Sequence, residues 1–416
     1  QVFNVLDLCI LVADWIASVD GSRPAVGMTV GWNPTRGRSG SSYSGGANNM
    51  NLSDDDGYDD PNILHELGHY VEDEFGRSRN TGGSHSISDD DQDPRLAWSE
   101  GFATYVSAAT LEFHGLPLPN IYIDRDSFGV SGGGGFGYNF ENTQNGGGTN
   151  EGVVQAALWD LIDDSATADT SPGVDDDSAS GFEDEVWEVL GEMRIQQLPF
   201  TSMEDFWDLW RELGHGSETT VQAAFASHRI FYQVDSFEPN DSPETATPLT
   251  SSYKQNHFYK SGSEPAGDED WFSFSAVSGN YYRLSVNGSA NTIYGRPDPE
   301  VFLIDSDKET VLAFSDDPHD TSLNAATSNN NMIETVPEII WQAPASGTYY
   351  VYCRHSSHEL NKDGRYGTYN IRVTGTSAPT PTISEVAAQQ MRPGQTYWAV
   401  VTGTNFSQDA VVTLSN

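Results

Sequence analysis

Residues 59–76 read DDPNILHELGHYVEDEFG. A proline near the start of this stretch and a glycine at its end are typical limits of a helix, and apolar residues recur between them at helical spacing. On such a helix His65 and His69 are four positions apart and point from one face, so both can bind one zinc ion. Glu66 between them would lie beside a metal-bound water and serve as the general base. The stretch therefore predicts a helix that carries a zinc-dependent catalytic site.

A second stretch, WSEGFATY at residues 98–105, opens another expected helix that ends near Gly115. Glu100 in this stretch would supply a third ligand and leave the fourth zinc position open for water, which catalytic zinc requires. His85, in the polar insert 77–94, is a rival third ligand. Because it lies in a loop of glycine, serine and aspartate, we expect it to be exposed.

These two motifs resemble those of the gluzincin metallopeptidases. The segment SEGFA at 99–103 is similar to the one around the third ligand in the aminopeptidase branch of that clan. The resemblance implies that His65, His69 and Glu100 bind zinc and that Glu66 is the catalytic base. The metzincin pattern fits worse, since Glu72 and Phe75 stand where that pattern requires glycine and histidine.

Peptide hydrolysis of this kind also requires a donor that stabilises the developing oxyanion. In such enzymes this donor is often a tyrosine or a histidine, and Tyr138 and His114 are the two candidates, between which the sequence does not choose. The amine-binding motif of the aminopeptidases is not visible in the sequence, which favours an endopeptidase.

The chain divides into three regions that differ in their residue patterns. Residues 1–233 have mainly helical patterns, with one strand expected at 24–32 and helices at 151–163, 182–195, 203–213 and 219–230. Phe3, Leu6, Ile10, Ala13 and Ala17 share one face of a further helix at the start. The fold class we predict here is an α+β, zincin-like metallopeptidase domain.

Residues 234–376 contain short alternating runs with turn residues between them, which indicates an all-β, jelly-roll-like sandwich. Residues 377–416 contain a linker rich in proline and threonine and then the first strands of a truncated immunoglobulin-like β domain. The chain is thus expected to be a multidomain protein.

The sandwich resembles the bacterial pre-peptidase C-terminal domain through FEPND at 237–241, DEDWFSF at 268–274 and GTYYV at 347–351. Some domains of that family hold calcium between the first of these segments and an acidic turn. The resemblance implies a set of calcium ligands, whose oxygen-only chemistry suits that ion: Glu238, Asn240, Asp241, Asp268 and Asp270. The alternative is that these residues only form turns before strands.

The formal net charge is −41, and no lysine precedes Lys254. Such a chain repels nucleic acid and anionic membrane surfaces. The acidity fits adaptation to high salt, calcium binding or both. Asp7 and Asp14 interrupt the most apolar stretch, so we expect no membrane insertion. The two cysteines fall in different expected domains, which excludes a disulfide framework.

The first residue is Gln1, which we interpret as the start of either a processed or a truncated chain, so that any targeting segment has been removed. The sequence as a whole predicts a secreted or cell-surface zinc metalloendopeptidase that acts on protein or peptide substrates. The β domains are expected to serve calcium-dependent stability or binding to a surface or an extracellular polymer. The rival interpretation is a non-catalytic adhesion protein in which the zinc site is structural.

Overall fold

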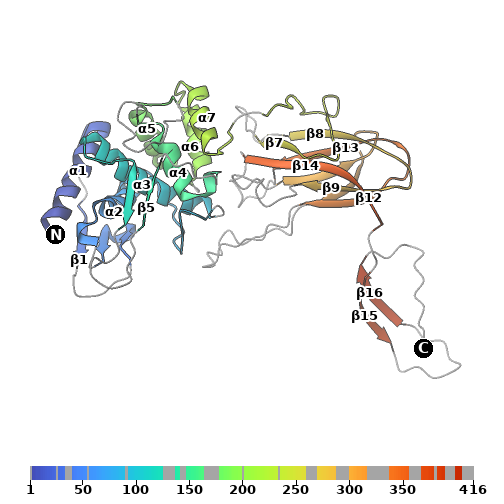
Figure 1. Ribbon diagram of the computed structural model, residues 1–416, viewed down its shortest axis with the longest axis horizontal. Helices are drawn as coiled ribbons and strands as arrows, with labels where there is room; N and C mark the ends of the chain where they lie inside the picture. The colour runs from blue at the N-terminus through green and yellow to red at the C-terminus, as the bar shows by residue number, and fades with distance from the viewer. Residues whose placement is uncertain are drawn as a thin grey trace.

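A computed structural model of the protein gives the fold (Figure 1). It describes residues 2–24, 27–32, 40–53, 56–89, 92–124, 136–140, 147–163, 178–198, 201–232, 235–258, 269–286, 299–315, 337–355, 367–378, 382–388 and 399–404. Two separate hydrophobic cores lie within these residues, one between residues 5 and 232 and one between residues 249 and 373. The architecture is therefore a mixed helical and β multidomain protein.

The first core is built mainly by helices. Their bounds are α1 Val2–Asp20, α2 Asp60–Phe75, α3 Pro94–Phe113, α4 Glu151–Trp159, α5 Glu183–Ile195, α6 Met203–Glu212 and α7 Glu218–Ser227. The helices expected after residue 150 are present as α4 to α7, with α4 and α7 shorter than expected. Single-turn 3-10 helices lie at Gly45–Ala47, Asp56–Tyr58 and Gly147–Thr149.

A small sheet lies beside α2 and has the strand order β1-β3-β2. Its strands are β1 Thr29–Trp32, β2 Ser42–Ser44 and β3 Asn49–Leu52. The central strand β3 pairs with β1 in parallel and with β2 antiparallel, which leaves β2 at an edge. A second pair, β4 Ile121–Asp124 and β5 Phe136–Asn139, is antiparallel.

Helix α1 buries a different face from the one that the sequence indicated. Phe3, Leu6 and Ile10 are exposed. The side chains packed into the core are instead Val5, Leu8, Val12, Trp15 and Ile16. The predicted helix and its shared apolar face are present, but this face is not the buried one, because α1 also carries apolar residues on its other side. By length and hydropathy α1 would also suffice to cross a membrane, although these five side chains pack in the core.

The sandwich consists of two sheets (Figure 1). One has the order β11-β10-β13-β8-β6 and the other β12-β9-β14-β7. Their bounds are β6 Thr247–Pro248, β7 Lys254–Phe258, β8 Glu269–Ala276, β9 Tyr281–Val286, β10 Pro299–Ile304, β11 Val311–Ser315, β12 Glu338–Gln342, β13 Gly347–His355 and β14 Gly367–Thr376. Alternate residues of β8 are buried, as a strand with one face on a core requires.

Two further strands, β15 Thr382–Ala388 and β16 Ala399–Thr404, form an antiparallel pair after the sandwich. Their pairing agrees with a β unit at this point, and its assignment to the immunoglobulin-like class stays a prediction. The two thiols are free, with Cys353 buried in the sandwich and Cys9 partly buried on α1, in agreement with the expected lack of a disulfide.

Helices α2 and α3 approach very closely at Gly68. A Cβ atom added to Gly68 would lie 2.4 Å from the backbone oxygen of Ala103 and 2.6 Å from its Cα atom. Both contacts are with backbone, which cannot rotate away as a side chain can. Glycine at position 68 therefore sets the separation of the two helices.

We expect Gly68→Ala to force α2 and α3 apart and to lower the free energy of unfolding by about 1–3 kcal/mol, the usual cost of overpacking. Gly191→Ala on α5 is the matched control, because a Cβ there meets nothing within 4 Å and alanine favours helix. Urea unfolding followed by tryptophan fluorescence measures both variants. Equal midpoints for Gly68→Ala and Gly191→Ala would contradict the close approach.

Candidate metal centre

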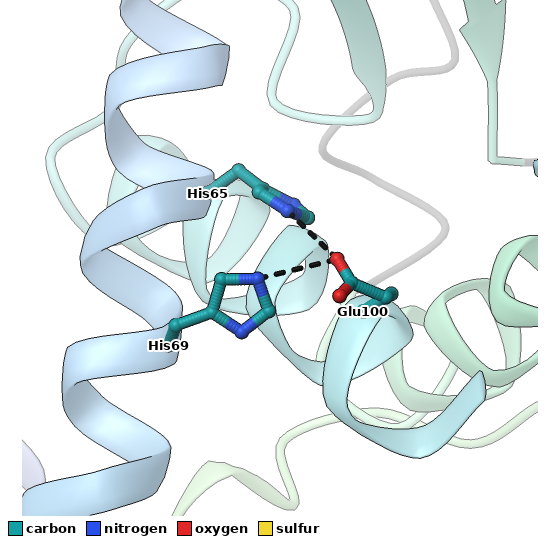
Figure 2. A group of neighbouring side chains, drawn as sticks. All are labelled: His65, His69 and Glu100. Atoms are coloured by element: carbon teal, nitrogen blue, oxygen red, sulfur yellow. Dashed lines mark ion pairs between the residues drawn. The ribbon is translucent and has the colours of Figure 1, made fainter. Parts of the chain in front are cut away.

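The close packing of α2 and α3 brings together the three side chains that the sequence singled out (Figure 2). His65 Nε2 and His69 Nε2, on neighbouring turns of α2, each lie 3.2 Å from Glu100 Oε2 on α3. The ligand atoms of the three residues lie within 4.8 Å of one another. In a tetrahedral zinc site with bonds of about 2.0–2.1 Å, neighbouring ligand atoms are about 3.3 Å apart. The observed separations therefore fit zinc.

Hydroxyl groups on α3 fix the orientation of both imidazole rings. Thr104 donates its hydroxyl hydrogen to the backbone oxygen of Glu100, so its oxygen accepts from His65 Nδ1 at 2.7 Å. Ser99 donates to Glu72 Oε2, and its oxygen faces His69 Nδ1 at 3.4 Å. With a metal bound, each ring would keep its hydrogen on Nδ1 and present the Nε2 lone pair to the centre, which is the tautomer that binds a metal.

Glu100 is oriented as well. Its Oε1 accepts a hydrogen bond of 2.9 Å from Asn80 Nδ2, which leaves Oε2 toward the histidines. Although burial alone would raise the pKa of Glu100, His69 and His65 hold it well below its ordinary value. Glu100 is therefore ionised, as a metal ligand must be. The sequence analysis did not identify Asn80, and its position in the polar insert gave no signal.

Glu66 lies on α2 between His65 and His69 in the sequence, and it is 6% exposed. Burial raises its pKa, and the neighbouring His65 and His69 act in the opposite direction. Glu66 Oε2 is buried without a hydrogen-bond partner among the described residues. A buried carboxylate oxygen of this kind is available to accept a proton from a bound molecule.

A cavity of about 870 Å³ lies over these residues. Helix α2 supplies His65, Glu66, His69 and Asp73, the edge strand β2 supplies Ser42 and Tyr43, and α4 supplies Glu151. Among the residues that the structure describes, four carboxylates and no lysine or arginine line this cavity: Glu66, Asp73, Glu100 and Glu151. The cavity is large enough for a segment of peptide.

His85 is exposed, as expected of a loop residue, and it also lines this cavity. Its side chain is 35% exposed, and its Nδ1 lies 2.7 Å from Glu151 Oε2. Its Nε2 lies 3.7 Å from Glu100 Oε2. The composition of the insert indicated a solvated loop. The loop is also held in place by the contacts of His85 with Glu100 on α3 and with Glu151 on α4.

The two candidates for the oxyanion donor differ in position. Tyr138 on β5 lines the cavity, and its hydroxyl donates to Gln155 Oε1. His114 lies just after α3, where its Nε2 is 3.0 Å from the backbone oxygen of Leu11. Because His114 does not line this cavity, the structure does not bring it to the metal centre.

At the acidic corner of the sandwich the structure brings together three of the five residues that the resemblance implied as calcium ligands. Asn240 donates from its backbone to Glu238 Oε2 at 2.8 Å and from Nδ2 to Asp270 Oδ1 at 2.9 Å. Asn240 Oδ1 is buried without a hydrogen-bond partner among the described residues. Asp241 is exposed, and Asp268 lies outside the described residues. Calcium binding here stays a prediction.

Asp270 is completely buried, and burial raises its pKa well above the ordinary value, although hydrogen bonds from Tyr369 and Asn240 oppose the shift. The folded protein therefore keeps a proton that the unfolded chain releases above about pH 3.9. This proton stabilises the sandwich fully below that pH, and its contribution is lost as the pH rises through the folded-state pKa.

In calcium-free buffer we therefore expect the free energy of unfolding of wild type to fall, relative to that of Asp270→Asn, by about 1.4 kcal/mol per pH unit. This fall is expected between about pH 3.9 and the folded-state pKa of Asp270. Thermal unfolding of both proteins from about pH 4 upward measures this difference. Added calcium should raise the unfolding temperature of wild type, since it selects the ionised carboxylate, and EDTA should reverse the rise. Parallel pH curves would contradict the buried proton, and an unchanged temperature with calcium would contradict the ion site.

Comparison with known proteins places the helical part in a family. The profile of the mycolysin C-terminal domain family matches residues 17–229, just over half of the chain, and includes the helices that carry His65, His69 and Glu100. The chain belongs to the mycolysin C-terminal domain family.

Other relatives match shorter parts of the chain. An uncharacterized protein of Archaeoglobus fulgidus is 30% identical over 155 residues, which are 36% of this chain and 41% of that protein. The chain thus spans about two fifths of this relative's length.

Two solved structures resemble smaller parts, at low identity. The pre-peptidase C-terminal domain of a Bacillus anthracis collagenase is 19% identical and matches 32% of this chain and 100% of its own, with a TM-score of 0.21. The lysozyme inhibitor PliG of Aeromonas hydrophila is 12% identical and matches 32% of this chain and 96% of its own, with a TM-score of 0.20.

Proposed function

We propose that this protein is a secreted zinc-dependent metalloendopeptidase. One observation carries the proposal: two histidine Nε2 atoms face one ionised carboxylate oxygen at 3.2 Å, with the buried Glu66 between them in the same cavity. His65, His69 and Glu100 would hold the zinc ion. A bound zinc ion would polarise the scissile carbonyl and lower the pKa of a water molecule.

Other residues of the chain would transfer protons, orient the zinc ligands and bind the substrate. Glu66 would accept a proton from the attacking water and return it to the leaving amine, the usual task of a positioned carboxylate. Thr104 and Ser99 would keep the two rings in the ligating tautomer, and Asn80 would keep Glu100 turned toward them. The cavity over the site, lined on one side by the edge strand β2, would receive an extended peptide segment.

Membership of the mycolysin C-terminal domain family supports the link to secreted metalloproteases, since domains of this family are typical accessory domains of such enzymes. The rival function is an adhesion protein with a structural zinc site. The position of Glu66 favours the enzyme, because a structural site has no use for a buried carboxylate that is aimed into a cavity. Under this proposal the β sandwich serves calcium-dependent stability or attachment.

Glu66→Gln is expected to lose activity, and Glu100→Ala is expected to lose zinc affinity. Glu66→Gln should bind about one zinc ion per chain and lose about 10²- to 10⁴-fold in kcat on an unstructured protein substrate, the share of a general base. Glu100→Ala should lose zinc affinity by more than the roughly 10- to 100-fold that removal of an outer-shell partner costs. Metal analysis by mass spectrometry and hydrolysis assays measure the two effects.

Glu74→Gln is the matched control for both variants, because Glu74 lies on the same helix, outside the cavity lining, where it accepts from Asn48. It should keep both zinc and activity. Full activity of Glu66→Gln would refute the proposed base. Wild type that folds without zinc would refute the enzyme and favour the adhesion protein.

A further inference from the structure

A third imidazole faces the same oxygen atom as the two motif histidines. His65 Nε2 and His69 Nε2 lie 3.2 Å from Glu100 Oε2, and His85 Nε2 lies 3.7 Å from it. The last distance is a few tenths of an ångström beyond the ligand separation of about 3.3 Å in a tetrahedral zinc site. His85 therefore approaches Glu100, but it does not belong to the group of three residues whose ligand atoms lie within 4.8 Å of one another.

The second ring nitrogen of His85 is held by a carboxylate, as it is in many histidines that bind a metal. His85 Nδ1 lies 2.7 Å from Glu151 Oε2, and this carboxylate, at the first residue of α4, is 8% exposed. A histidine that binds a metal typically donates its second ring nitrogen to a carboxylate or another oxygen, which fixes the tautomer. His65 with Thr104 and His69 with Ser99 follow the same rule. In all three rings Nδ1 is engaged and Nε2 points toward Glu100.

The loop that carries His85 is anchored after this residue and contains two glycines before it, of which Gly82 donates its backbone N–H to Asn80 Oδ1 at 2.7 Å. After His85, the side chain of Gln92 donates to the backbone oxygen of Ser86, and Asn150 Nδ2 donates to that of Ile87. Before His85, Gly82 and Gly83 have φ angles of +63° and +126°, and a Cβ there would meet nothing within 4 Å. Two unpacked glycines in this conformation permit a change of backbone angles that other residues resist.

We propose that His85 is a fourth protein ligand of the metal and closes the site in the resting protein. This inference rests on the proposed function, because it requires the metal that His65, His69 and Glu100 would hold. Four protein ligands are typical of a closed zinc site, whereas catalysis needs an open position. His85 must therefore leave the metal for a substrate to enter, and a change of backbone angles at Gly82 and Gly83 would permit this movement. Glu151 is a positioning residue for His85.

The test counts the imidazole rings bound to zinc by X-ray absorption spectroscopy of the full chain. His85→Asn is the informative variant, because its amide keeps a donor near Glu151 and lacks the nitrogen that faces Glu100. Wild type should show three imidazoles per zinc ion and His85→Asn two, with a zinc dissociation constant at least about tenfold higher. Ser88→Ala, in the same loop and exposed, is the control and should show three.

Two imidazoles in wild type would overturn this inference and leave the proposed function intact. If His85→Asn then lost kcat with unchanged zinc affinity, His85 would be an oxyanion donor instead. Wild type without zinc would overturn both the inference and the proposed function. A third imidazole that persists in His85→Asn would also overturn the inference, since another histidine would then be the ligand.

Discussion

The close approach of α2 and α3 at Gly68 is the constraint on which the candidate site depends. A side chain at this position would collide with the backbone of Ala103. Without it the two helices pack at backbone contact, and Glu100 comes within 3.2 Å of both histidines. Gly101 has a similar role on the opposite side of α3, where a Cβ would lie 2.7 Å from the backbone oxygen of Glu151. Two glycines thus bring α2, α3 and α4 around one point.

Three of the buried carboxylates have partners that the fold supplies. In the metal centre, Glu100 is surrounded by histidines and Asn80, and Glu72 receives a hydrogen bond from Ser99. In the sandwich, Asp270 is buried with two hydrogen-bond donors and a raised pKa. Other carboxylates of this strongly acidic chain, such as Glu188 and Glu218, are exposed, where water and ions screen their repulsion.

The polar insert between α2 and α3 illustrates how a loop can complete a site. It contributes Asn80, which orients Glu100, and His85, which reaches Glu151 across the cavity. Its glycines and serines indicated solvent exposure, and residues 82–86 are exposed. Hydrogen bonds from Gln92 and Asn150 to its backbone also hold it over the cavity.

The sequence by itself determined the elements whose signals are local. The HELGH helix, the following helix with Glu100, and the change from helical to alternating patterns near residue 234 all follow from spacing and from turn residues. The buried face of α1, the place of His85 and the remoteness of His114 were decided only by the tertiary structure. A helix with apolar residues on two sides, or a polar loop, has no preferred side until other elements pack against it. The reason is physical: local spacing specifies the direction of a side chain from its own element, and packing specifies what it meets.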